Sequence, residues 1–180
     1  MRIQTFIFSV LISLLLTFIS NAQTISAGAS IGGGTISGET PSIGSFSTSL
    51  YVETVSPFED DISIRLAFFY MQDIDKLLPD TRTVYFSFIK GFSLKAILTQ
   101  ELENNFFIEE GLGLITVNDR TLSRTNEWDY GAAVSIGGGL DLRNDNMKGF
   151  KIGAGLEFGI TFFNTLPKYS SVYLSVQRYF

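Results

Sequence analysis

Apolar and polar residues alternate along most of this chain, and the clearest run covers residues 149–162. One face of this run consists of Phe150, Ile152, Ala154, Leu156, Phe158, Ile160 and Phe162. The opposite face consists of Lys151, Gly153, Gly155, Glu157, Gly159 and Thr161. A period of two over this length is typical of a β-strand whose two faces meet different environments.

The same pattern recurs in eight runs along the chain. They cover residues 24–32, 45–55, 61–70, 83–98, 105–117, 128–142, 149–162 and 170–180. Turn residues Asn144-Asp145-Asn146 separate the sixth run from the seventh and predict a hairpin there. Connections that are short alternate with connections that are longer and polar, namely 33–44, 71–82 and 118–127, while 163–169 is short for its class. Short turns at one end and longer loops at the other are typical of outer-membrane barrels.

Two charged residues interrupt the apolar faces. A lysine facing lipid costs about 2–4 kcal/mol at mid-bilayer and little near the interface. We therefore expect Lys90 near the outer rim, with residues 83–89 extending above the membrane. Alternation places Glu110 on the apolar face of its strand, whereas a bulge at Glu110-Gly111 would turn it inward, and the sequence leaves both arrangements open.

Alternation by itself fits either a soluble lipocalin-like barrel, apolar inside, or a membrane barrel, apolar outside. Glycine recurs on the polar face, which suits a crowded interior. Aromatic residues collect at the strand ends, with Tyr70, Trp128, Tyr130, Phe162 and Phe163 at one end and Phe106, Phe150, Tyr179 and Phe180 at the other. Such girdles mark the water boundaries of membrane barrels. The predicted fold is therefore an all-β, eight-stranded antiparallel up-and-down transmembrane β-barrel.

The first residues have the character of a cleavable signal peptide. Arg2 precedes an apolar stretch over residues 3–19, and Ser20-Asn21-Ala22 places small residues where signal peptidase requires them. We expect a signal peptide over residues 1–22 and the barrel domain over residues 23–180. An uncleaved helical anchor is the alternative, because the stretch is about as long as a membrane span.

Composition excludes several classes of function. The net charge of −5 argues against a nucleic-acid partner, which requires a basic face. The chain contains no histidine and no cysteine, so the usual nucleophile–base pairs and zinc ligands are missing. We expect no enzymatic activity, no cofactor and no metal site. Gly32-Gly33-Gly34 lacks the lysine and helix of a phosphate loop and is interpreted as a flexible loop.

Charged residues on the polar faces are nearly balanced in sign. They are Glu53, Arg65, Lys95, Glu109, Asp141, Lys151 and Glu157. Eight strands enclose an interior just wide enough for side chains, so we expect an ion-pair network and a closed lumen. In the loop 118–127, Arg120 and Arg124 are candidates for binding lipopolysaccharide phosphates, with solvated loop charges as the alternative.

The chain ends in an alternating strand with a terminal aromatic residue, Phe180, and its leader runs into Asn21-Ala22-Gln23. In these features it resembles the OmpA/OmpX superfamily of outer-membrane barrels, in the form common in Bacteroidetes-type bacteria. The resemblance implies that the last strand is the signal for the barrel-assembly machinery, carried by Val172, Leu174, Val176 and Phe180. Arg178 departs from that pattern.

The resemblance also implies a monomer in the cell outer membrane, in contact with membrane lipid and lipopolysaccharide. We expect a non-enzymatic protein with a structural, surface-recognition or adhesive role through its extracellular loops. A small passive pore is the alternative, and a soluble lipocalin-like carrier is less favoured.

Overall fold

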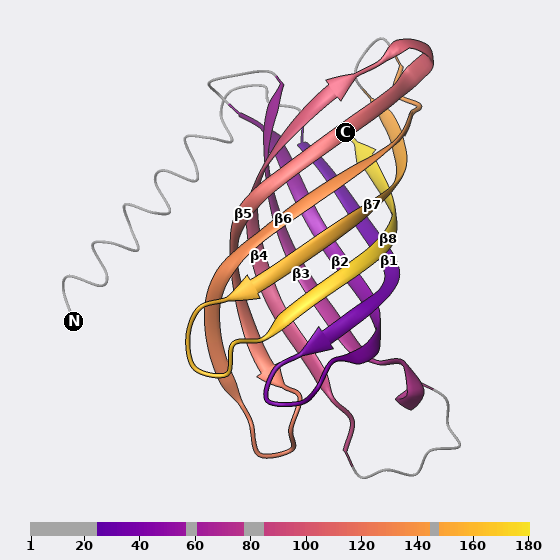
Figure 1. Cartoon of the computed structure of the whole chain (residues 1–180). Helices are drawn as coiled ribbons and strands as arrows, with labels where there is room; N and C mark the ends of the chain where they lie inside the picture. Colours follow the sequence, from indigo (N-terminus) through magenta and orange to yellow (C-terminus); the bar gives the residue numbers. More distant parts are fainter. Residues whose placement is uncertain (1–24, 57–60, 78–84, 145–147) are drawn as a thin grey trace, which may run out of the picture.

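The computed structural model describes residues 25–56, 61–77, 85–144 and 148–180; the expected signal peptide at 1–22 lies outside them. Eight antiparallel strands close into one barrel in chain order, and β1 pairs with both β2 and β8 (Figure 1). The strands are β1 (Ile25–Ser37), β2 (Ile43–Val55), β3 (Ile62–Asp73), β4 (Phe88–Glu101), β5 (Phe106–Arg120), β6 (Glu127–Asp141), β7 (Gly149–Thr161) and β8 (Lys168–Tyr179). The predicted all-β antiparallel barrel is confirmed.

Helical structure within the described residues is limited to two 3₁₀ turns, η1 (Ile74–Lys76) and η2 (Glu103–Asn105). No helix in this part of the chain has the length and apolar character needed to cross a membrane.

The barrel has two ends, which we call the loop end and the turn end. The loop end holds the connections 38–42, 74–87, 121–126 and 162–167. The turn end holds the remaining connections and the C-terminus, and it is the upper end in Figure 1. Of the three connections expected to be long, 74–87 is long, whereas 38–42 and 121–126 are shorter than expected, because the strands beside them continue further than the alternation indicates.

The segment Gly32-Gly33-Gly34 shows why β1 is longer than expected. It lies inside the strand, so its interpretation as a flexible loop is wrong. A methyl group added to Gly32 or Gly34 would overlap the backbone carbonyl of Val172 or Ser170 in β8. Glycine here permits the close approach of two strands along the crowded inner wall.

The two faces of the strands are oriented as the alternation predicts. In β7, Lys151 is 4% exposed whereas Leu156 is 53% exposed, so the apolar face points outward. The aromatic residues of the expected girdles also point outward, with one exception. Tyr179 is buried, and it faces the lumen because it shares the inward parity of β8.

The structure decides the two positions that interrupt the apolar faces. The register of β5 with β6 is continuous through Glu110 and Gly111, so the strand has no bulge and Glu110 is exposed on the outer face. Lys90 is the third residue of β4 and lies near the loop end, as expected. The strand begins at Phe88 rather than at residue 83.

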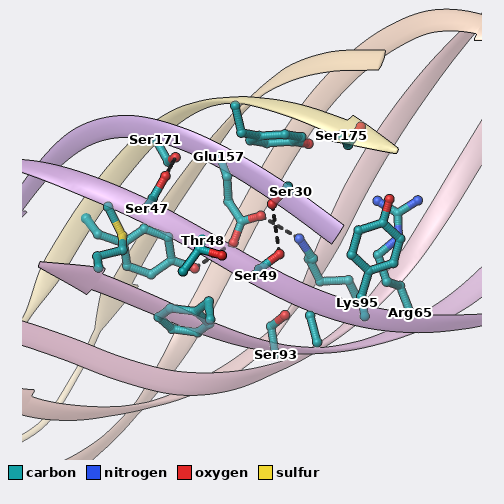
Figure 2. Close-up of a pocket in the computed structure, with 16 residues that line it drawn as sticks. Ser30, Ser47, Thr48, Ser49, Arg65, Ser93, Lys95, Glu157, Ser171 and Ser175 are labelled. Atoms are coloured by element: carbon teal, nitrogen blue, oxygen red, sulfur yellow. Dashed lines mark hydrogen bonds and ion pairs between the residues drawn. The ribbon is translucent and has the colours of Figure 1, made fainter. Parts of the chain in front are cut away.

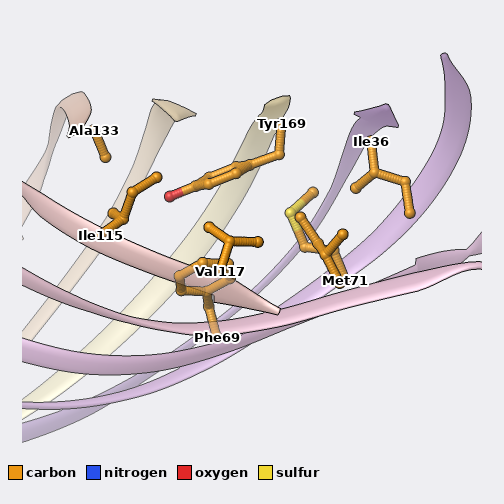
Figure 3. Packing of buried hydrophobic residues seen from close by; sticks show 8 residues of the cluster. Ile36, Phe69, Met71, Ile115, Val117, Ala133 and Tyr169 are labelled. Carbon is orange, nitrogen blue, oxygen red and sulfur yellow. The ribbon is translucent and has the colours of Figure 1, made fainter. Parts of the chain in front are cut away.

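Apolar side chains fill the interior near the loop end. The buried cluster contains Ile36, Phe69, Met71, Ile89, Ile115, Val117, Ala133 and Tyr169, with Ile43 packed against it. Figure 3 shows these side chains converging from opposite walls of the barrel. Two of the rings, those of Phe69 and Tyr169, have centroids 5.0 Å apart. We call this cluster the apolar plug.

Candidate functional site

The interior of the turn-end half is filled with charged side chains joined in pairs, centred on Arg65. Its Nε donates to Glu53 Oε2 at 2.5 Å, and its Nη2 donates to Glu109 Oε2 at 2.8 Å. All three side chains have at most 13% of their surface exposed. One guanidinium therefore neutralises two buried carboxylates from different strands, which is the geometry that a buried charge requires.

Lys95 lies directly opposite Arg65 in the ladder of β3 with β4. Two like charges in this position repel each other unless each has its own counter-ion. Lys95 Nζ turns away to Glu157 Oε2 at 2.6 Å, and the other oxygen of Glu157 accepts from Tyr169 Oη at 2.7 Å. The hydroxyl of Tyr169 thus joins the charged half to the apolar plug.

A third group of charges lies closest to the turn end. Lys151 Nζ is 3.9 Å from both Glu109 Oε1 and Asp141 Oδ2, and it lies 4.7 Å from the ring centroid of Phe107. Arg143 Nε donates to Asp141 Oδ1 at 2.9 Å, and Arg143 Nη2 lies 2.6 Å from Glu101 Oε1. Burial alone would lower the pKa of Arg143, but the hydrogen bonds to Asp141 raise it above the usual value.

The structure brings together all seven charged residues that the sequence analysis placed in the lumen. It adds Arg143, Glu101 and Tyr179, whose ring centroid lies 4.7 Å from Arg143 Cζ. Sequence reasoning missed Arg143 because this residue lies beyond Asp141, the last residue of β6, in the connection to β7. The available signal was its parity, since Arg143 continues the inward series of Gly139 and Asp141.

Hydroxyl groups occupy the layer between the charges and the apolar plug. Ser47 and Ser171 are 2.7 Å apart, and Ser30 and Ser49 are 2.9 Å apart (Figure 2). The cavity in this layer has a volume of about 40 Å³. That is room for about two or three water molecules, so the layer does not form a passage.

A larger cavity, of about 490 Å³, lies at the turn end. Its lining includes Ser26, Glu53, Asp61, Ser63, Arg143 and Lys151. Glu53, Arg143 and Lys151 of the charged network form part of its wall, and the apolar plug lies beyond that network, toward the loop end. We call it the vestibule. A path along the barrel axis is therefore blocked twice, by ion pairs and by packed apolar side chains.

The chemistry open to this interior is limited. Histidine and cysteine are missing from the sequence, so no imidazole or thiolate is available as base or nucleophile. Among the residues that the structure describes, no group of three or more acidic, histidine or cysteine side chains is close enough to hold a metal ion. The carboxylates of the lumen are instead engaged with Arg65, Lys95, Lys151 and Arg143.

The two arginines predicted to bind surface phosphates lie at the loop end. Arg120 is the last residue of β5, and its guanidinium carbon is 5.8 Å from the ring centroid of Phe88. Arg124 is exposed in the connection that follows. The residues of the predicted assembly signal are exposed on the outer face of the last strand and at its end. They are Val172, Leu174, Val176 and Phe180.

Solved structures with the same architecture include two bacterial surface proteins. The crystal structure of Neisserial surface protein A matches with a TM-score of 0.65 and 12% identity, over 87% of this chain and 97% of that chain. Ail, the attachment invasion locus protein of Yersinia pestis, matches with a TM-score of 0.52 and 12% identity, over 88% and 97%. At this identity the likeness shows a shared fold, the closed β-barrel described above.

A further crystal structure shows Ail in complex with the heparin analogue sucrose octasulfate, and it matches this chain with a TM-score of 0.52 and 14% identity. Neither a protein-family model nor a curated protein matches the sequence. The comparisons therefore show the barrel fold, and membership of the OmpA/OmpX superfamily, in its Bacteroidetes-type form, stays a prediction.

Proposed function

We propose that this chain is an integral, non-enzymatic protein of a Gram-negative outer membrane with a structural or surface-recognition role. The observation that carries this proposal is a continuous outward belt of large apolar side chains, to which every strand contributes. Aliphatic residues of the belt that are at least 50% exposed include Ile31, Leu50, Val52, Leu66, Leu94, Leu112, Leu114, Val134, Ile136, Leu156, Val172 and Leu174. Exposing an apolar belt of this extent to water is unfavourable, so we infer that it lies against the hydrocarbon of a lipid bilayer.

Site-directed fluorescence tests the orientation of the two faces against lipid. The sequence contains no cysteine, so each position can carry the single thiol for a polarity-sensitive probe. Refolded into bilayers, probes at Ile152 and Leu156 are expected to emit at shorter wavelength and to be quenched by lipid-borne quenchers. Probes at Lys151 and Glu157 are expected to escape quenching or to block folding. Quenching of the second pair alone would contradict a membrane location.

A small passive pore is the second candidate, and the interior argues against it. The vestibule reaches the turn end, but the apolar plug leaves no polar path to the loop end. Planar-bilayer recording of the folded protein is expected to show no stable open level. A steady ohmic conductance would favour the pore, and the soluble carrier would be favoured if the protein stayed monodisperse without detergent.

Surface recognition is proposed for the loop end. Arg120 and Arg124 lie in or beside the connection 121–126 and offer guanidinium groups suited to lipopolysaccharide phosphates. The name of Ail refers to attachment, which gives a precedent for adhesion on this fold. The double variant Arg120→Gln/Arg124→Gln is expected to weaken binding of lipopolysaccharide micelles, whereas Lys148→Gln at the turn end is the matched control. Equal binding by both variants would contradict this assignment.

Assembly and oligomeric state complete the proposal. We propose that the last strand is recognised by the barrel-assembly machinery through Val172, Leu174, Val176 and Phe180, and that the folded protein is a monomer. The backbone N–H of Phe180 donates to Ile25 O at 3.1 Å, so the terminal residue also takes part in closing the barrel. Deleting Phe180 is expected to reduce the amount of folded protein in outer membranes, measured by the gel shift between unboiled and boiled samples.

A further inference from the structure

Buried side-chain oxygens without a hydrogen-bond partner gather at the loop end of the barrel. Within the described residues, five of the seven such oxygens lie there, namely Thr40 Oγ1, Ser45 Oγ, Asp119 Oδ2, Thr121 Oγ1 and Asp129 Oδ1; the other two, Ser63 Oγ and Glu109 Oε1, lie toward the turn end. Asp119 and Asp129 are both 0% exposed, and Thr121 is 1% exposed. A buried carboxylate oxygen without a partner is costly, so this concentration of such atoms calls for a ligand.

In each aspartate, one carboxylate oxygen accepts hydrogen bonds and the other has no hydrogen-bond partner. Asp119 Oδ1 accepts from the backbone N–H of Thr121 at 2.8 Å. Asp129 Oδ2 accepts from the backbone N–H and the hydroxyl of Thr165, both at 3.1 Å. The register of β5 with β6 places the two aspartates two positions apart on the same inward face. Both carboxylates are thereby oriented before any ligand binds.

Gly38, in the β1–β2 connection, borders the free oxygens. A methyl carbon added to Gly38 would overlap Asp119 Oδ2 and would lie 2.9 Å from Thr121 Oγ1. The two oxygens thus face one point in space beside the glycine. Glycine at this position lets the β1–β2 connection pack directly against both oxygens, and a larger side chain would displace them.

No cation faces these carboxylates among the residues that the structure describes. The ion pairs of the lumen involve other residues, toward the turn end. Arg120 is adjacent to Asp119 in sequence, but neighbouring strand residues point to opposite faces, and its guanidinium lies over the Phe88 ring. Within the described residues, no ion pair is formed by Asp119 or Asp129.

We propose that Asp119, Thr121 and Asp129 bind a hard divalent cation, Ca²⁺ in preference to Mg²⁺. All the available donors are oxygens, which suit these ions, and Ca²⁺ tolerates the irregular geometry of a hydroxyl beside two carboxylates. With two carboxylates alone, the remaining ligands are hydroxyls and water. An affinity of about 10⁻⁴–10⁻³ M, that of extracellular calcium modules, is expected.

The cation would join connections that are far apart in sequence. Gly38 belongs to the β1–β2 connection, Thr121 to the β5–β6 connection, and Thr165 to the β7–β8 connection. The first two already meet through the hydroxyl of Thr125, which donates to Glu39 Oε2 at 2.8 Å. Cation binding would fix these connections over the apolar plug and close the loop end.

Terbium luminescence tests the site in the full-length protein folded in detergent micelles. Tyr85 donates a hydrogen bond to Leu122 O at 2.8 Å, so its ring lies close enough to Thr121 to sensitise bound Tb³⁺. Saturable emission is expected, displaced by Ca²⁺ at lower concentration than by Mg²⁺. Asp119→Asn and Asp129→Asn should each weaken Tb³⁺ binding by roughly tenfold or more. Glu127→Gln is the matched control and should bind as the original chain does, because the carboxylate of Glu127 is exposed.

Gly38→Ala gives an independent test, because it keeps both carboxylates but its methyl group would displace Asp119 Oδ2 and Thr121 Oγ1. It should weaken Tb³⁺ binding while the unboiled protein still migrates as a folded barrel. In thermal unfolding, Ca²⁺ should raise the Tm of the original chain relative to EDTA and leave the Tm of Asp119→Asn unchanged. Absence of saturable emission, or equal emission from the original chain and both asparagine variants, would overturn the proposal.

Discussion

Near the loop end the interior of the barrel is packed with apolar side chains, whereas toward the turn end it is filled with paired charges. Phe69 and Met71 in β3 belong to the apolar plug, and Arg65, on the same face of the same strand, is the centre of the ion network. The strand does not change its geometry between these positions. The side chains that fill the lumen change from charged to apolar between Arg65 and Phe69 of this one strand.

The interior of one barrel can therefore be filled in two physically different ways. Apolar packing needs no partner of a particular charge, but any lost volume leaves a cavity. Paired charges need matched partners from several strands, and removing one partner leaves an uncompensated charge. The apolar plug therefore fills the part of the lumen toward the loop end without polar partners, while the turn end contains the vestibule.

The largest effect is expected from Arg65→Met, which leaves Glu53 and Glu109 buried without a cation. The free energy of unfolding should fall by about 3–5 kcal/mol. Urea titration of the protein in lipid vesicles, followed by the fluorescence of the single tryptophan, Trp128, measures the change. Adding Glu53→Gln and Glu109→Gln to the variant should restore most of the loss. Wild-type stability of Arg65→Met alone would show that the network contributes little.

In the apolar plug, Met71→Ala should lower the free energy of unfolding by about 2–5 kcal/mol through the cavity that it creates. Because no charge is involved, the loss should be the same at low and high salt. Leu122→Ala, at an exposed site in the β5–β6 connection, is the control and should change stability by less than about 0.5 kcal/mol. A salt-dependent loss for Met71→Ala would mean that the two halves are coupled electrostatically.

The hydroxyl layer between the halves should show an intermediate effect. Ser47→Ala leaves the hydroxyl of Ser171 without its partner, and a loss of about 1 kcal/mol is expected. A double-mutant cycle with Ser171→Ala isolates the pair. Zero coupling energy would indicate that water replaces the missing partner, and the boundary of the wet region would then lie closer to the loop end.

The smallest effect is expected from Glu101→Gln at the rim of the vestibule. The Glu101 side chain is 65% exposed, so its ion pair with Arg143 is screened by water and should contribute less than about 0.5 kcal/mol. Arg143 keeps Asp141 as its partner in this variant. Asp141→Asn should cost more, because the Asp141 side chain is only 13% exposed. Equal losses from the two variants would contradict the gradient of burial along the charged half.

Two expectations from the sequence were wrong, and one question that it left open was decided by the structure. Gly32 and Gly34 resemble a flexible loop in one dimension, but they allow β1 to approach β8. Tyr179 resembles a girdle residue by its position near the chain end, yet its parity turns it toward Arg143. The facing of Glu110 depended on a bulge, and the register of β5 with β6 excludes one.

The sequence by itself determined the β architecture, the eight strands and the outward direction of the apolar faces. These properties follow from a period of two, which each strand carries locally and without reference to its neighbours. Parity along the strands also identified seven of the charges that share the lumen, but not Arg143, which lies beyond the end of β6. The sequence did not determine which of these charged residues pair with one another.

Only the tertiary structure decided which side chains meet. Arg65 pairs with Glu53 and Glu109, rather than with Glu157, because register and rotamer set the distances across the barrel. Closure of the sheet brings β1 beside β8, so that Gln177 Nε2 donates to Ser26 Oγ at 2.7 Å although 151 positions separate them. Contacts of this kind depend on how all eight strands are staggered at once, and no local pattern along the chain encodes that stagger.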